Sequence, residues 1–230
     1  MAAEIPSGRK APPTVSDPRP RSSAFSLLEL LAVIAVIGIL AALIFPSVGA
    51  ARKSANRANT KVQFNQWAAA IESFRSEYGY YPTFDTTNLV NGGAAPSAFG
   101  DHLFHDLLAG KRRDGSALSA GSALTQNRKR LAFHTFSERE LTDATAPFPF
   151  LLRDAFDNVS IAVLVDRNLD GLINAADYAG GFPFVATAGG DSIRPSVTEI
   201  PATGLRTGVA FYSADPNATA ANPEFILSWK

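Results

Sequence analysis

Hydrophobic residues are distributed unevenly along this chain, and the densest apolar run lies near its start. From Phe25 to Val48 the sequence reads FSLLELLAVIAVIGILAALIFPSV, in which Glu29 is the only ionisable side chain. A run of 24 residues with this composition is long enough to form a membrane-spanning helix. Because an unpaired carboxylate is costly inside a bilayer, we expect Glu29 to have a functional partner.

After this run the pattern changes to apolar residues at helical spacing among polar ones. The segment 49–82 keeps helix-forming residues and carries one apolar stripe, made of Phe64, Trp67, Ile71, Phe74 and Tyr78. Spacings of three and four residues predict a helix with one face on a core, here the second half of a long N-terminal helix. Gly79 and Pro82 are expected to end it.

The remainder, 83–230, is predicted to be a globular domain of short elements separated by Gly and Pro. Alternating or β-branched apolar segments predict strands at 159–165, 208–213 and 224–229. Two short helices are expected at 99–108 and 128–136. The predicted fold class is therefore α+β, with a long N-terminal helix packed on a small antiparallel β-sheet.

Charge and composition add two constraints. The 230 residues carry 21 Lys and Arg against 21 Asp and Glu, so no basic excess suggests nucleic acid as a partner. The first 24 residues, rich in Pro, Ser and Arg, are predicted to be a flexible leader whose basic residues keep the N-terminus cytoplasmic. The chain has no cysteine, so neither a disulfide nor a cysteine-linked lipid anchor is available to it.

The segment AFSLLELLAVIAVIGILAALIFP resembles the start of type IV pilins and of type II secretion pseudopilins. This resemblance implies that a prepilin peptidase cuts between Ala24 and Phe25, methylates the new N-terminus, and leaves Glu29 to act in assembly. Gly38 and Pro46 stand where the family carries a glycine and a helix-breaking proline. Ala24 departs from the glycine that usually precedes the cut.

The same resemblance implies a pilin-like fold and a structural role rather than an enzymatic one. The expected protein is a single-pass subunit of the inner membrane with a periplasmic C-terminal domain, which passes into a filament. The implied partners are prepilin peptidase, other pilin or pseudopilin subunits, an inner-membrane platform protein, an assembly ATPase that acts indirectly, and a secretin. The motifs of common hydrolases, nucleotide-binding loops and zinc proteases do not occur in the sequence.

Other interpretations of the apolar run remain open. It can be a secretory signal peptide, for which Val48-Gly49-Ala50 offers a small-residue cleavage site, or a plain membrane anchor with Glu29 near the headgroups. Between Gly38 and Pro46 the helix is expected to melt and stretch when it is packed into a filament; the alternative is that Pro46 merely marks the lipid boundary.

A second candidate site lies in DRNLDGLINAAD, at 166–177. Oxygen-bearing residues occur at the spacing of an EF-hand-type calcium loop, with Gly171 at the sharp turn, and the candidate ligands are Asp166, Asn168, Asp170, the Leu172 carbonyl, Asn174 and Asp177. The loop is similar to those of dockerin modules. It predicts calcium as a cofactor, and the alternatives are a polar turn or, for the whole chain, a membrane-anchored calcium-dependent adhesion module.

Overall fold

The computed structural model describes residues 26–230 apart from 85–86, 93–101, 119–120, 144 and 146–149, and it leaves out the side chains of 43–47. The chain divides into two compact units, Met1–Val48 and Gly49–Lys230. Every residue of the two buried hydrophobic clusters belongs to Gly49–Lys230, so this unit carries its own core.

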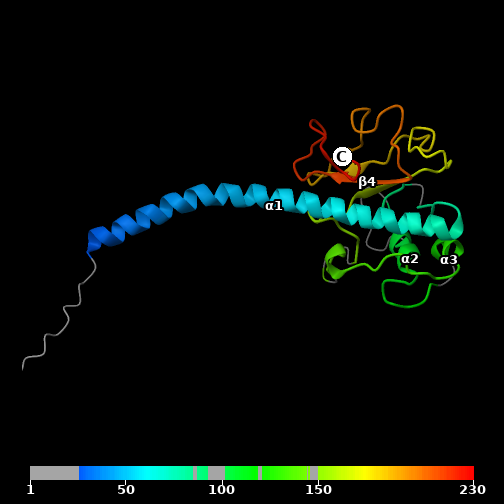
Figure 1. The fold of residues 1–230 in the computed structure, drawn as a ribbon, viewed down its shortest axis with the longest axis horizontal. Coiled ribbons are helices and arrows are strands. Elements are labelled where there is room, and N and C mark those ends of the chain that lie inside the picture. The colour runs from blue at the N-terminus through cyan, green and yellow to red at the C-terminus, as the bar shows by residue number, and fades with distance from the viewer. Residues whose placement is uncertain (1–25, 85–86, 93–101, 119–120, 144, 146–149) are drawn as a thin grey trace, which may run out of the picture. The chain divides into compact units, whose positions relative to one another are not determined.

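The described elements confirm the α+β class (Figure 1). The helices are α1 (Leu27–Tyr78), α2 (Leu103–Ala109), α3 (Ser122–Gln126) and the 3-10 helix η1 (Glu138–Glu140). The strands are β1 (Ile161–Val165), β2 (Val185–Ala186), β3 (Ser192–Ile193), β4 (Val209–Ala214) and β5 (Phe225–Leu227). In Figure 1, α2 and α3 lie on one side of the C-terminal half of α1, and β4 lies on the other.

The main sheet is antiparallel, in the order β1-β4-β5, with Val163 opposite Phe211 and Tyr212 opposite Leu227. Its strands β1 and β5 fall within predicted segments, and β4 covers the third apart from Gly208 and extends one residue beyond it, to Ala214, so the three predicted strands are confirmed. The two-residue strands β2 and β3 form a separate antiparallel pair that the sequence did not predict.

The predicted apolar stripe on α1 lies in the core. Phe64, Trp67, Ile71 and Phe74 are fully buried, and they pack with residues of α2 and with one face of the sheet. The Phe64 ring stacks on that of Phe211, with 5.6 Å between centroids. Strand alternation directs neighbouring residues such as Leu164 and Tyr212 into a second cluster on the opposite face.

The helix α1 ends where the sequence predicted, because Gly79 adopts a φ of +80° that an L-residue rarely takes. A tighter constraint lies at Gly208, just before β4. A Cβ at this position would stand 1.7 Å from the Tyr81 hydroxyl and 2.5 Å from Glu72 Oε1. Glycine therefore allows the start of β4 to approach the C-terminal end of α1.

The two short helices were predicted less well. In place of 99–108, α2 begins at Leu103, and 99–101 lie outside the described residues. The helix predicted at 128–136 is wrong, since this segment is a turn followed by irregular chain. Arg130 has a left-handed φ of 54°, and the Leu108 carbonyl accepts hydrogen bonds from the N–H groups of Phe133 and His134. Contacts with α2 thus replace the intrahelical bonds of a helix.

Candidate functional site

Glu29 lies in the first turn of α1, where its carboxylate caps the helix. Its Oε2 accepts a hydrogen bond of 2.9 Å from the Ser26 N–H, while Ser26 Oγ accepts one of 3.2 Å from the Leu28 N–H. This is most of a capping box, for which the pattern S-x-x-E in SLLE was a signal that sequence reasoning missed. The processing residues Ala24 and Phe25 lie outside the described residues.

The helix that follows Glu29 is apolar on every side. Its large side chains from Leu27 to Leu40 are between 50% and 85% exposed, with Val33 the least and Leu27 the most exposed. A helix with apolar residues all round has no polar face to present to water, so such a surface marks a site of contact with lipid or protein.

A membrane span is not confirmed. Within the part of the chain that the structure describes, no helix is both long and apolar enough to cross a membrane. The membrane-spanning segment at 25–48 therefore stays a prediction.

Gly38 and Pro46 both fall inside α1, so neither residue ends the helix. A Cβ at Gly38 would meet no atom within 4 Å, which means that no close packing within the chain requires glycine there. The expected melting and stretching between these two positions stay a prediction.

Asp215 connects α1 near Lys53 and Arg57 to the main sheet. Asp215, directly after β4, has a fully buried side chain that contacts Lys53 Nζ at 3.1 Å and Arg57 Nη2 at 2.5 Å. Burial alone would raise the pKa of Asp215, but hydrogen bonds from the Asn217 N–H, Lys53 and Arg57 lower it below its usual value. Sequence reasoning missed this contact, since 158 residues separate Arg57 from Asp215.

The loop 166–177 folds around its own carboxylates. Asp166 accepts hydrogen bonds from the N–H groups of Asp170, at 3.3 Å, and Gly171, at 2.8 Å. Asp177 accepts from the N–H groups of Arg167, Asn168 and Asn174 at 3.0, 3.4 and 2.9 Å, so it closes the loop from its far end. Gly171 has the positive φ, 85°, that the predicted sharp turn requires.

These residues have the oxygen atoms that calcium prefers, and a carboxylate oxygen keeps a lone pair after accepting one hydrogen bond. However, Asp170 is exposed, and its oxygens accept bonds from the Leu172 N–H and the Asn168 amide. No group of three His, Cys, Asp or Glu side chains placed to hold a metal ion occurs among the described residues. Calcium binding by Asp166, Asn168, Asp170, Leu172, Asn174 and Asp177 stays a prediction.

Comparison with known proteins supports the N-terminal assignment. Residues 19–45 match the family model described as the prokaryotic N-terminal methylation motif. The match includes Ala24, Phe25, Glu29 and Gly38, and it confirms the resemblance of this segment to type IV pilins and pseudopilins. No curated protein and no solved structure matches the chain. The motif supports a pilin-like or pseudopilin precursor that is processed by prepilin peptidase and assembles with other pilin subunits.

Proposed function

We propose that this chain is a structural subunit of a type II secretion or type IV pilus-like filament, and that it acts by assembly rather than by catalysis. One observation carries the proposal: the methylation motif at 19–45 coincides with a helix whose apolar side chains are exposed from Leu27 to Leu40. Such a helix needs an apolar environment, which a bilayer supplies before assembly and neighbouring subunits supply after it.

The chemistry of assembly follows from Glu29. Cleavage before Phe25 creates an α-ammonium one helical turn from the Glu29 carboxylate. In the structure Glu29 accepts the Ser26 N–H, and no ion pair of Glu29 occurs among the described side chains. In a filament the carboxylate meets the Phe25 amine of a neighbouring subunit, so both charges are neutralised and the axial register of the subunits is set.

In this proposal the precursor spans the inner membrane once, with the leader in the cytoplasm and Gly49–Lys230 in the periplasm. Prepilin peptidase cuts and methylates it, and an inner-membrane platform protein, driven indirectly by an ATPase, adds it to the filament. A secretin surrounds the filament in a cell with an outer membrane.

Two substitutions at Glu29 test the role of its charge. Glu29→Gln removes the charge but keeps a side chain that can complete a capping box, whereas Glu29→Ala removes both. We expect both variants to be cut and both to lose filaments. Filaments sheared from cells and quantified by immunoblot provide the measurement. If Glu29→Gln assembles normally while Glu29→Ala does not, Glu29 acts only as a helix cap and the charge-pairing mechanism is wrong.

Mass analysis of the mature N-terminus tests the processing step. The expected N-terminus is methylated Phe25. A mature chain that begins at Ala51 would identify a signal peptide instead, and an uncut Met1 would identify a plain membrane anchor.

A further inference from the structure

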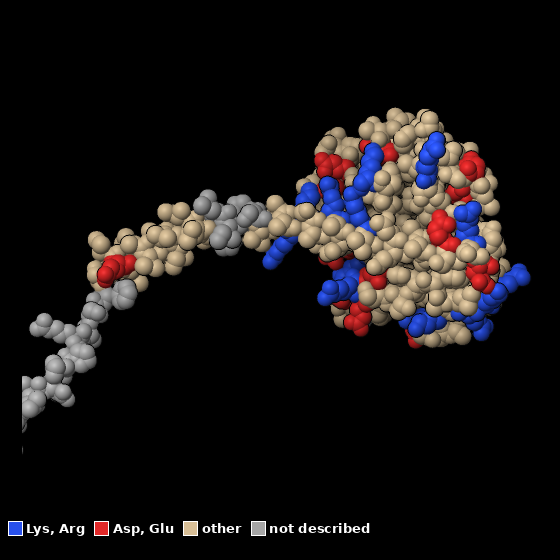
Figure 2. Space-filling model, in the orientation of Figure 1, with Lys and Arg blue, Asp and Glu red and all other residues tan. Residues whose placement is uncertain are grey.

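The fold brings two basic runs together at the end of the domain that holds α2 and α3. The side chains that define this basic end are Lys111, Arg112, Arg113, Arg128, Lys129 and Arg130. The Asn127 amide joins the two segments because it donates to the carbonyls of Leu107 and Leu131, both at 2.8 Å. A Cβ at Gly110 would lie 2.6 Å from the Arg130 carbonyl, so the first run leaves α2 directly against the second. Figure 2 shows Lys and Arg side chains gathered over this end.

Few acids neutralise the basic end. Glu77 pairs with Lys129, and Asp114, which accepts the Ser116 N–H in its own turn, lies near enough to Arg112 for the two charges to attract. Arg112, Arg128 and Arg130 are exposed, and no ion pair of theirs occurs among the described side chains. Arginine is the cation best suited to bind carboxylates, since its planar group offers two parallel donors.

Arg113 adds a positive charge just below this surface. Its three guanidinium nitrogens are buried and have no hydrogen-bond partner in the described structure. Burial lowers the pKa of Arg113 to about 10, against a smaller opposing effect of Asp106, so the group remains charged at neutral pH. Glu77, Asp114 and Asp106 offset only part of this charge, so the basic end keeps an excess of positive charge among the described side chains.

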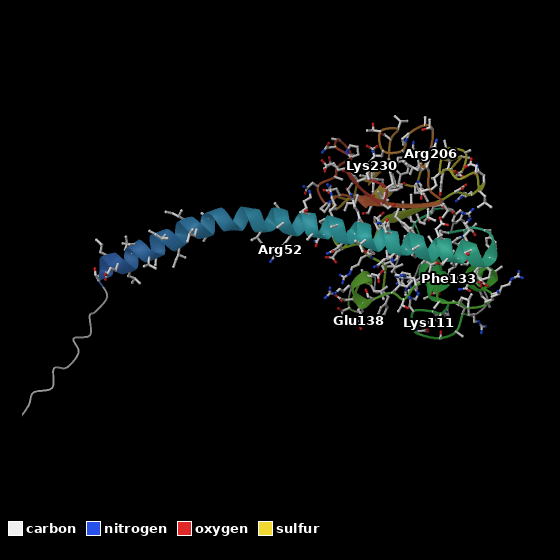
Figure 3. The ribbon with its side chains drawn as sticks, in the orientation of Figure 1. Arg52, Lys111, Phe133, Glu138, Arg206 and Lys230 are labelled. Carbon is white, nitrogen blue, oxygen red and sulfur yellow. The ribbon has the colours of Figure 1, made fainter. Side chains whose placement is uncertain are left out.

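A pocket of complementary chemistry lies beside β5. This β5 pocket has a volume of about 360 Å³, and its lining residues include the acids Glu199 and Glu224 and the apolar residues Phe225 and Leu227. In Figure 3, Lys230, which also lines the pocket, lies on the side of α1 opposite to Lys111 of the basic end. Basic end and pocket thus lie on opposite sides of the helix within one domain.

The cations of the pocket are held by the chain itself. Arg57 forms its ion pair with Asp215, and Lys230 Nζ donates to the Thr198 carbonyl at 2.9 Å. Burial raises the pKa of Glu199, but hydrogen bonds from Ser196 and the attraction of the nearby Lys230 ammonium lower it below its usual value, so this carboxylate is ionised and Lys230 already offsets part of its charge. Glu224 is exposed, and the Asn222 amide donates to it at 3.2 Å. Two carboxylates beside apolar walls suit the guanidinium and the aliphatic stem of an arginine.

We propose that an arginine of the basic end in one copy of the chain docks in the β5 pocket of the next copy. The contact is heterologous, because it joins two different surfaces that one domain presents in opposite directions. Repetition of a heterologous contact that does not close produces an open helical filament. This inference rests on the proposed filament function, and it adds a contact between domains to the contact between apolar helices.

Charge reversal with rescue tests the contact in filaments assembled by the full chain. Arg112→Glu, Arg128→Glu and Arg130→Glu are each made alone and together with Glu224→Arg. We expect at least one single reversal to lower filament yield roughly tenfold, since like charges would then face each other. Its combination with Glu224→Arg should restore the yield. The matched control is Arg206→Glu, an exposed arginine outside both surfaces, which should leave the yield unchanged.

Unchanged yield in all three reversals would overturn the contact, and so would a loss that Glu224→Arg does not restore. Glu29→Ala in the same assay separates this failure from failure of the filament function itself, because that variant should lose filaments whatever the domains do. Heparin retention of Gly49–Lys230 is measured in parallel. If a reversal abolishes retention without changing filament yield, the basic end binds a polyanion and the proposal is wrong. Thermal melts of each variant domain verify that it is folded.

Discussion

The two halves of α1 differ in where their apolar side chains find partners. From Leu27 to Leu40 the large apolar side chains are at least half exposed, whereas Phe64, Trp67, Ile71 and Phe74 are fully buried in the core of the domain. The first half is apolar on all sides, and the second half is apolar on one stripe. The comparison indicates two tasks for one helix: its second half completes a domain, and its first half presents apolar side chains that the described residues leave exposed, as the proposed assembly requires.

Replacement of Trp67 should change the unfolding free energy of the domain more than any other substitution proposed below. Trp67→Ala removes a fully buried indole and the 2.8 Å hydrogen bond from its Nε1 to Glu140, so we expect Gly49–Lys230 to lose about 3–5 kcal/mol of unfolding free energy. Denaturant unfolding measures the change. Trp67→Phe, which keeps most of the volume, should cost less and allows the measurement if the alanine variant does not fold.

The matched change in the first half is Leu31→Ala, at a side chain that is 63% exposed. In the full chain in detergent micelles it should leave the unfolding free energy of the domain within about 0.5 kcal/mol of the unchanged protein. A domain destabilised as strongly by Leu31→Ala as by Trp67→Ala would show that the two halves do not have separate tasks.

Gly208 tests how closely the second half of α1 packs against the start of β4. Gly208→Ala places a methyl group where Tyr81 and Glu72 now stand, and we expect a loss of about 1–3 kcal/mol from overpacking. Gly180→Ala is the control, because a Cβ there meets no atom within 4 Å. Equal stability of the two variants in urea would contradict the close approach of β4 to the end of α1.

Sequence patterns predicted the local features of the fold but not the contacts between distant segments. The stripe from Phe64 to Phe74 was visible because helical periodicity is local, and the fold class followed from it. The helix predicted at 128–136 was wrong because residues outside that segment bind its backbone. The Leu108 carbonyl accepts from the Phe133 and His134 N–H groups, and the Asn127 amide donates to the Leu131 carbonyl. Strands of two residues, such as β2, are too short to leave a pattern.

Only part of the candidate functional site could be predicted from the sequence. Glu29 was recognisable because its motif is contiguous in sequence, and even its cap could have been predicted from Ser26. The contact of Asp215 with Lys53 and Arg57, the joining of the two basic runs and the β5 pocket depend on tertiary packing. No local pattern contains them.

The pH dependence of stability tests the Asp215 contact. Since the folded-state pKa of Asp215 is lowered, its stabilisation is present above the unfolded pKa of about 4 and is lost as pH falls through the lower, folded-state pKa. Asp215→Asn should therefore cost about 1–2 kcal/mol at pH 7 and flatten the acid decline of stability. Glu138→Gln, at an exposed carboxyl group, is the control. An acid decline as steep in Asp215→Asn as in the unchanged domain would contradict the assignment.

Calcium addition tests whether Gly49–Lys230 is complete without a ligand. Three carboxylates in 166–177 repel one another, and a calcium ion would neutralise them. With a dissociation constant of about 10⁻³ M, calcium at about 10 mM adds roughly 1.4 kcal/mol, or a rise of about 2–5 °C in the melting temperature of Gly49–Lys230. Asp170→Ala should abolish this rise, and magnesium at the same concentration controls for ionic strength. A melting temperature that calcium leaves unchanged would mean that the backbone N–H groups bonded to Asp166 and Asp177 already satisfy the loop. The domain would then need no external ligand, in full contrast to the apolar helix before it.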